Sequence, residues 1–228
     1  LPVSSIRSLA FVDSTTGFAT FKDSGNYSIY KTLNGGSTWN PTTLADQSKE
    51  LFVVMRSNSD GWALEYDGSK IYGTSDGFNT YTTYNFSGLT LKDISIYGSS
   101  AYFSGTSGFL GVASNPQSTP STFQTTPVVD WTSIAPDKSG GVFLSSSTDV
   151  YHLTTPGAVG LDLDFPQPSG LMADLCAQDS NTVLVAGHWS VTTLTRDKGA
   201  TWETILPAEY ENYTYYGCHF IDEHHLFL

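Results

Sequence analysis

Short apolar segments alternate with polar turns along the whole chain. One apolar segment is Leu9 to Phe11, and a polar turn separates it from Gly17-Phe18. The next repeats this order, with Leu51 to Met55 followed by a turn and Gly61-Trp62. Apolar segments of this length, bounded by Gly, Asn, Asp and Ser, predict β-strands. No segment has the 3.6-residue periodicity of a long helix, so the pattern predicts an all-β protein.

The same order of segments recurs about every 42 residues, which indicates a repeat architecture. Its marker is a large aromatic residue, which follows a threonine in four of five cases and Asp164 in the other. The five aromatics are Trp39, Tyr81, Phe123, Phe165 and Trp202, at intervals of 42, 42, 42 and 37 residues. We expect them to hold equivalent positions.

Four short strands in about 40 residues are what one blade of a β-propeller requires. The sequence therefore predicts an all-β fold, a β-propeller of four-stranded antiparallel blades with five full repeats and the start of a sixth. We expect a single propeller over residues 1–228. The predicted blades are residues 6–42, 48–84, 90–126, 130–167, 171–206 and a partial blade at 215–228.

Three turns share a motif in which a threonine is followed two residues later by Asp or Asn. Residues 195–202 fit Ser/Thr-x-Asp-x-Gly-x-Thr-Trp at every defined position, residues 32–39 have Asn for Asp, and residues 74–81 lack the second glycine. The motif residues are Thr32, Asn34, Gly36, Trp39, Thr74, Asp76, Tyr81, Thr195, Asp197, Gly199 and Trp202.

These turns resemble the Asp-box of BNR/sialidase-type repeats and of Ycf48-like photosystem II assembly factors, and the resemblance covers nearly the whole chain. An Asp or Asn side chain accepts hydrogen bonds from backbone N–H groups of its own turn, and glycine supplies the positive φ angles. We therefore expect the motif acids to be structural and not catalytic.

In propellers of this kind, ligands usually lie on the face opposite the Asp-box turns. Exposed aromatic and acidic side chains on that face are suited to a glycan or to a protein partner. The candidate binding residues are Tyr27, Glu65, Tyr66, Asp67, His188, Trp189, Tyr210 and Tyr213.

The sequence argues against catalysis. Sialidases hold the substrate carboxylate with three arginines, whereas this chain has only Arg7, Arg56 and Arg196, and Arg196 lies inside an Asp-box. We therefore assign no catalytic residue. A glycoside hydrolase that uses a carboxylate pair stays an alternative, and its candidate acids are Glu65, Asp67, Asp93 and Asp174. A Ycf48-like assembly factor is a second alternative, although the basic arginine patch of that family has no counterpart here.

Charge and composition narrow the partners further. The chain has 22 acidic and 10 basic residues, which give a net charge of −12 and argue against nucleic acid. No apolar run reaches the roughly 20 residues that span a bilayer, so we expect no membrane insertion. Abundant Ser, Thr, Gly, Tyr and Asn, with sequons at Asn26, Asn85 and Asn212, favour an extracellular, cell-surface or virion-surface glycoprotein.

Cys176 and Cys218 are too few for a disulfide framework, and neither has a second thiol at the spacing of metal ligands. We expect two buried free thiols. His224 and His225 point to opposite faces of a strand and do not share a metal. The sequence thus predicts neither a metal site nor a cofactor.

Residues 215–222 restate residues 7–13, so a sixth blade has begun. Unpaired strand edges promote association. We therefore expect completion by a longer polypeptide or a neighbouring copy, and self-association of the isolated chain. The repeats, the motif turns and the missing sialidase arginines together predict a non-catalytic propeller scaffold that presents loops for glycan or protein binding.

Overall fold

The computed structural model of this chain describes residues 5–166, 172–188, 191–205, 213–222 and 225–228. In these residues the regular structure consists of β-strands, which confirms the predicted all-β class. Within the same ranges there is no helix long and apolar enough to cross a membrane. Four residues of interest, Trp189, Tyr210, Asn212 and His224, lie outside the described part.

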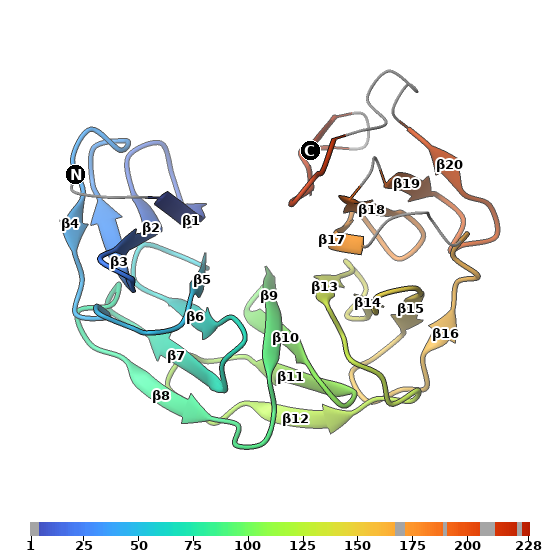
Figure 1. Cartoon of the computed structure of the whole chain (residues 1–228), viewed down its shortest axis with the longest axis horizontal. Helices are drawn as coiled ribbons and strands as arrows, with labels where there is room; N and C mark the ends of the chain where they lie inside the picture. Colours follow the sequence, from blue (N-terminus) through green and yellow to red (C-terminus); the bar gives the residue numbers. More distant parts are fainter. Residues whose placement is uncertain (1–4, 167–171, 189–190, 206–212, 223–224) are drawn as a thin grey trace. The chain divides into compact units, whose positions relative to one another are not determined.

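The strands form five sheets of four strands and one of two strands (Figure 1). Sheet 1 contains β1 (Ser5–Phe11), β2 (Gly17–Asp23), β3 (Asn26–Thr32) and β4 (Asn40–Pro41), and sheet 2 contains β5 (Leu51–Met55), β6 (Gly61–Glu65), β7 (Lys70–Thr74) and β8 (Thr82–Asn85). Sheet 3 contains β9 (Leu91–Tyr97), β10 (Ser100–Gly105), β11 (Phe109–Ala113) and β12 (Ser121–Gln124).

Sheet 4 contains β13 (Ser133–Pro136), β14 (Val142–Ser145), β15 (Val150–Leu153) and β16 (Leu161–Asp162), and sheet 5 contains β17 (Met172–Ala177), β18 (Val183–Gly187), β19 (Thr192–Thr195) and β20 (Glu203–Thr204). Sheet 6 contains only β21 (His219–Phe220) and β22 (Leu226–Phe227). In every sheet the strands lie side by side in chain order. Five full repeats and the start of a sixth are therefore confirmed.

The chain divides into two compact units. Unit 1 is Leu1–Phe103 with Gly111–Ser121, and unit 2 is Ser104–Leu110 with Thr122–Leu228. Sheets 1 and 2 belong to unit 1, sheets 4, 5 and 6 belong to unit 2, and sheet 3 contributes residues to both.

Neighbouring sheets within a unit pack face to face. Strand side chains alternate between two faces, so Phe18 and Ile29 of sheet 1 point the same way and meet Val53 and Ala63 of sheet 2. In unit 2, Phe143 of sheet 4 packs in the same way against side chains of sheet 5. Each such side chain contributes about 1.5–3 kcal/mol when fully buried.

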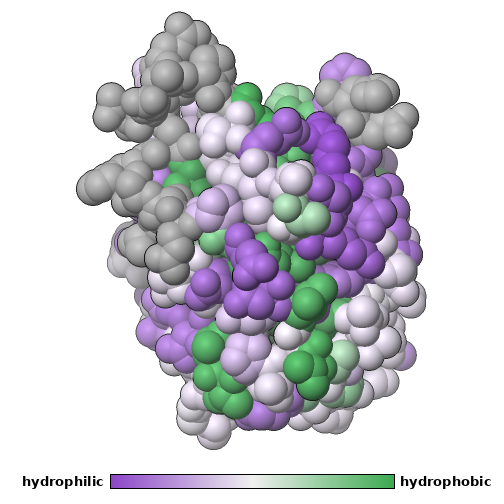
Figure 2. Space-filling model, turned by 90° about the vertical axis from the view of Figure 1, so that its right-hand side faces the viewer, coloured by the Kyte–Doolittle hydropathy of each residue, from purple (hydrophilic) through white to green (hydrophobic). Residues whose placement is uncertain are grey.

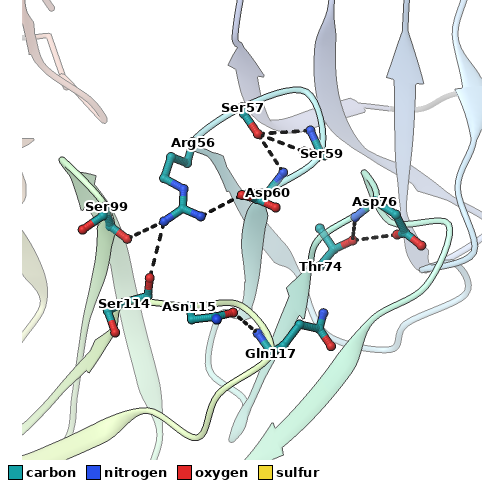
Figure 3. Close-up of polar contacts among 10 residues, drawn as sticks. All are labelled: Arg56, Ser57, Ser59, Asp60, Thr74, Asp76, Ser99, Ser114, Asn115 and Gln117. Carbon is teal, nitrogen blue, oxygen red and sulfur yellow. Dashed lines mark hydrogen bonds and ion pairs between the residues drawn. The ribbon is translucent and has the colours of Figure 1, made fainter.

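A polar contact also joins sheets 2 and 3 within unit 1 (Figure 3). Arg56, in the turn after β5, pairs with Asp60 at 2.7 Å and donates to the backbone oxygens of Ser99 at 2.9 Å and Ser114 at 3.4 Å. Its guanidinium carbon also lies 5.8 Å from the centre of the Trp62 ring. Arg56 therefore has a structural role as a link between two sheets.

Only three of the five marker aromatics hold equivalent positions. Trp39, Tyr81 and Trp202 each directly precede the fourth strand of their sheet. In sheets 3 and 4 that position belongs to Pro120 and Gly160, so the true intervals are 42, 39, 40 and 42 residues. The equivalence predicted for the other two aromatics was wrong.

Phe123 lies inside β12, and Phe165 lies after β16. Phe165 packs edge-on against Trp202, with ring centres 4.9 Å apart. The Phe123 ring covers Gly157, where an added Cβ would lie 2.9 Å from it. Both residues thus make other packing contacts in unit 2, and their 42-residue spacing does not reflect equivalent positions in the sheets.

The prediction of free thiols was also wrong, because Cys176 and Cys218 form a disulfide with their Cα atoms 5.7 Å apart. Cys176 lies in β17, and Cys218 directly precedes β21. The turn hydrogen bonds Gln178 N to Thr182 O and Ile221 N to His225 O match, so Cys176 corresponds to His219, and Cys218 lies one residue before that position in the adjacent sheet. The disulfide covalently joins sheet 6 to sheet 5.

Candidate functional site

The three Thr-x-Asp/Asn turns form the hydrogen bonds expected of structural turns. Asp197 Oδ1 accepts from Thr195 Oγ1 and from the Thr201 amide, both at 2.8 Å, and its Oδ2 accepts from Thr201 Oγ1 at 2.6 Å. Asn34 Oδ1 accepts from Thr32 Oγ1 at 3.0 Å and from the Thr38 amide at 2.9 Å. These side chains hold the chain between the third and fourth strands.

The same bonds set the protonation of the motif acids. Hydrogen bonds from Thr201 and Thr195 lower the pKa of Asp197. Burial raises the pKa of Asp76, but hydrogen bonds from Thr80 and Thr74 outweigh it, and the net shift is downward. Both turns therefore hold an ionised carboxylate at neutral pH.

The turn of sheet 2 departs from the motif for a packing reason. Gly36 and Gly199 have φ angles of 89° and 85°, while Phe78 holds that position in sheet 2 with φ 62°. The Phe78 side chain is fully buried and packs edge-on against Phe18 at 6.3 Å. A core contact thus offsets the strain that a side chain meets in the left-handed region.

Glu65, a predicted binding residue, is buried at the end of β6. Its Oε1 accepts from Tyr72 Oη at 2.6 Å and lies 3.4 Å from Lys70 Nζ. Burial and the neighbouring Glu65 raise the pKa of Tyr72, so the phenol stays a hydrogen-bond donor. Glu65 therefore anchors the loop that follows it.

That loop presents Tyr66 and Asp67, the next two candidates. The Tyr66 ring lies 5.1 Å from the Phe52 ring and 5.6 Å from Lys92 Nζ, and Lys92 also pairs with Asp67 at 2.5 Å. The Tyr66 amide donates to Glu50 O at 2.8 Å, and the Glu50 carboxylate lies 3.9 Å from Arg7 Nε. We call this group, Arg7, Glu50, Phe52, Tyr66, Asp67 and Lys92, the Tyr66 surface.

Tyr27 lies outside the Tyr66 surface. It is buried in β3, where it exchanges two backbone hydrogen bonds of 2.8 Å with Gln47. Lys22 Nζ lies 5.4 Å from the centre of its ring. The contact with Gln47 fixes residues 42–50 against sheet 1.

In unit 2, His188 follows β18 at the position that Tyr66 holds after β6. Its ring meets the Tyr216 ring edge-on at 5.6 Å, and the Tyr215 amide donates to Gly187 O at 3.0 Å. Tyr213 and Tyr216 are both exposed. We call His188, Tyr213 and Tyr216 the His188 surface; two further candidates, Trp189 and Tyr210, lie outside the described residues.

No family model and no curated protein matches this chain. Solved structures do match, including YCF48 bound to D1 peptide (15% identity, TM-score 0.61, 97% of this chain and 89% of that one). Another is YCF48 from Cyanidioschyzon merolae, with 13% identity and a TM-score of 0.72 over 95% of this chain and 74% of that one. A third is a GH74 enzyme of Niastella koreensis, with 16% identity and a TM-score of 0.64 over 92% of this chain and 33% of that one.

The chain has a β-propeller fold. At these identities the likeness establishes the fold alone, and function has to be argued from the site.

Two further acids of this propeller chain lie on inner strands. The Asp174 carboxylate in β17 accepts hydrogen bonds from Ser133 Oγ at 3.0 Å, from the Leu175 amide at 2.8 Å and from the Cys218 amide at 2.9 Å. Asp93 in β9 accepts from the Ile94 amide at 2.7 Å. The Asp174 carboxylate therefore ties three inner strands of unit 2 together.

The polar turn predicted between the first and second strands has a recurring hydrogen-bond pattern that was not predicted. Asp13, Ser57 and Asp179 each accept from backbone amides two and three residues ahead. The hydrogen bonds from Thr15 and Thr16 lower the pKa of Asp13 to about 2. Asp or Ser just after the first apolar segment was the signal for this turn.

The fourth sheet varies this turn with a buried hydrogen bond between an aspartate and a histidine. Asp137 accepts from Ser139 and Gly141, and its Oδ2 lies 2.7 Å from His152 Nε2. Burial raises the pKa of Asp137, but the hydrogen bonds from His152, Ser139 and Gly141 lower it by more, so the net shift is downward. Both side chains are buried, so this pair belongs to the core of unit 2.

The described residues contain no group of three His, Cys, Asp or Glu side chains that could hold a metal ion. Two of the three sequon asparagines lie within the described residues. Asn26 is exposed at the start of β3, and Asn85 is exposed at the end of β8, where it accepts from Ser69 Oγ at 3.1 Å.

Proposed function

We propose that this chain is a non-catalytic β-propeller scaffold that binds a protein segment at the Tyr66 surface. One observation carries the proposal: the packed rings of Phe52 and Tyr66 are joined through Tyr66 to two partly exposed ion pairs, by the contact of its ring with Lys92 and the hydrogen bond of its amide to Glu50. Aromatic anchors surrounded by polar groups are the composition of protein-binding hot spots.

The ion pairs suit a partner that has charges of both signs. Arg7 with Glu50 and Asp67 with Lys92 are partly exposed, and such pairs contribute little to stability. A bound segment can therefore exchange its own charged groups into them at small cost. Because Lys92 also lies over the Tyr66 ring, it can hold the ring in place until a partner arrives.

A structural comparison supports a peptide partner. One similar propeller is described as YCF48 bound to D1 peptide. We infer that this chain also binds a peptide segment, and the chemistry of the Tyr66 surface, not that partner's identity, defines the ligand. The Asp-box family assignment belongs to the same proposal and is supported by the hydrogen bonds of Asp197 and Asn34.

The engagement of the candidate acids supports a non-catalytic role. A glycoside hydrolase needs two carboxyl groups that face the substrate. Glu65 is buried against Tyr72, Asp67 pairs with Lys92, and Asp174 accepts three hydrogen bonds from its own fold. We expect purified protein to show no turnover of sialosides or β-glucans.

A glycan is the second candidate ligand, at the His188 surface. Tyr213 and Tyr216 expose their rings, and His188 holds the Tyr216 ring from its edge. Exposed rings of this kind stack on the apolar faces of sugars. We also propose an extracellular or surface location, which the Cys176–Cys218 disulfide supports because disulfides persist in oxidising compartments.

Phage display of random peptides on the purified protein tests the main proposal. Enriched peptides should bind at least tenfold more weakly to Tyr66→Ala and to Lys92→Ala, because each change removes part of the anchor. Tyr97→Ala is the matched control, since Tyr97 is an exposed tyrosine of unit 1 outside the Tyr66 surface. Peptides that bind all three variants equally would place the site elsewhere, and no enrichment would reject peptide binding.

A further inference from the structure

On one face of sheet 1, three apolar side chains of β1 are exposed. The strand register places Ile6 opposite Phe21, Leu9 opposite Ala19, and Phe11 opposite Gly17. Their side chains therefore lie on one side of the sheet, the side opposite Phe18 and Ile29. We call the group Ile6, Leu9 and Phe11 the open face of sheet 1.

The corresponding face of sheet 2 is covered. Leu51 pairs with Glu65, Val53 with Ala63, and Met55 with Gly61, so these three match Ile6, Leu9 and Phe11 in turn. Leu51, Val53 and Met55 are 0%, 2% and 9% exposed because sheet 1 packs on them, whereas Ile6, Leu9 and Phe11 are 57%, 55% and 46% exposed. The open face is thus built like one half of a sheet-to-sheet contact.

Sheet 6 carries the other half of such a contact. Phe220 and Leu226 point toward Leu184 and Leu194 of sheet 5, so Phe227, their neighbour in the strand, points away. Together with Ile221 it forms the outer face of sheet 6, where the two side chains are 65% and 57% exposed.

The outer face of sheet 6 matches the covered side of sheet 1. Phe227 pairs with His219 as Phe18 pairs with Ala10, and Ile221 donates to His225 O as Val12 donates to Thr16 O. Phe18 is fully buried under sheet 2. In sheet 6 the same position is open.

Exposure alone would not carry an inference. Figure 2 shows a side of the molecule where hydrophobic residues form small groups among hydrophilic ones, as is normal for protein surfaces. The exposed faces of sheets 1 and 6 differ from such scattered groups. Each matches one side of the buried interface between sheets 1 and 2.

We propose that the open face of sheet 1 binds the outer face of sheet 6 of a second copy of this chain. The contact would repeat the packing of sheet 1 on sheet 2, with Phe227 in the place of Phe18. Since two different surfaces meet, each bound copy leaves one of each kind free, and assembly continues until a ring closes or a filament forms. The Tyr66 surface takes no part, so this inference does not depend on the peptide-binding proposal.

Two charge variants and their mixture test the assembly. The wild-type protein should form species larger than a monomer in sedimentation velocity as its concentration rises. Leu9→Glu or Phe227→Glu alone should abolish this, because either change puts a charge into one half of an apolar contact. Mixed together, the two variants should form a 1:1 complex and stop, since one keeps an intact outer face and the other an intact open face.

Leu33→Glu is the matched control, because Leu33 is 67% exposed in the turn after β3 and lies outside both faces. It should assemble like the wild type. Melting curves check that every variant is folded, and Leu9→Ser and Phe227→Ser replace any variant that is not. A monomeric wild type, assembly that survives both variants, or a mixture without a 1:1 complex would each overturn the proposal.

Discussion

The two units tie neighbouring inner strands together with different chemistry. In unit 1, Ser8 Oγ of β1 accepts from the Val53 amide of β5 at 3.0 Å and lies 3.4 Å from Val53 O. In unit 2, Ser133 Oγ of β13 accepts from the Leu175 amide at 3.2 Å and donates to Asp174, which also accepts from the Cys218 amide.

The difference lies in charge and covalency. The tie in unit 1 is a neutral hydroxyl, whereas unit 2 adds a carboxylate and the Cys176–Cys218 disulfide. A buried acid, Asp137, is also found in unit 2, while the acid of the matching turn in unit 1, Asp13, is exposed. We therefore expect these inner-strand ties and this turn of unit 2 to respond to charge removal and to reductants more strongly than their counterparts in unit 1.

The largest expected effect is that of Asp137→Ala. The change leaves His152 buried without its carboxylate and removes the acceptor for the Ser139 and Gly141 amides, which should cost about 3–5 kcal/mol. Urea unfolding measures the loss. Asp13→Ala is the control in the matching exposed turn and should change the unfolding midpoint far less. Equal losses in the two variants would contradict the comparison.

Cys218→Ser should have the next largest effect, about 2–4 kcal/mol, because the disulfide closes a long loop. Cys176→Ser and the double variant should match it, and a reductant should then change nothing further. Hydrogen exchange should show faster exchange at residues 213–222 and unchanged exchange in β1 to β8. A wild-type melting point that does not respond to a reductant would remove the covalent half of the comparison.

The polar ties themselves should differ by a smaller amount. Asp174→Ala leaves the Leu175 and Cys218 amides without this acceptor and should cost about 1–3 kcal/mol, while Ser8→Ala should cost about 1 kcal/mol. Both are measured by urea unfolding at pH 7. The comparison fails if Ser8→Ala costs more than Asp174→Ala.

Much of the fold was predictable because its determinants are local. Alternation and turn residues define each strand, and the Thr-x-Asp/Asn motif defines three turns, so the number of sheets and the role of Asp197 followed directly. Phe123 and Phe165 misled the alignment because an aromatic side chain in contact elsewhere looks the same in sequence as one that marks the repeat.

The candidate site was harder to predict because burial depends on distant partners. Nothing near Glu65 in sequence shows that the Tyr72 hydroxyl donates a hydrogen bond to its buried carboxylate. Lys92 joins the Tyr66 surface from another sheet. The disulfide was equally hard to predict, because Cys218 does not hold the repeat position that matches Cys176.

The smallest expected effect concerns charge in the motif turns. Sheet 1 holds its turn with Asn34 and sheet 5 with Asp197, whose pKa is lowered by Thr201 and Thr195. A carboxyl group with a lowered folded-state pKa stabilises the fold above its unfolded pKa of about 3.9, and this contribution is lost as pH falls through the folded pKa. Asp197→Asn keeps the acceptor oxygen, so its stability should be near that of the wild type at pH 7.

In acid, Asp197→Asn should lose less stability than the wild type as pH falls below about 4, and Asn34→Asp should lose more. Urea unfolding at pH 7 and pH 3 measures both changes. Because the two turns share the same hydrogen bonds, the two substitutions should shift the acid dependence in opposite directions. If both shifted it in the same direction, the charge of Asp197 would not be the source of the acid sensitivity of its turn.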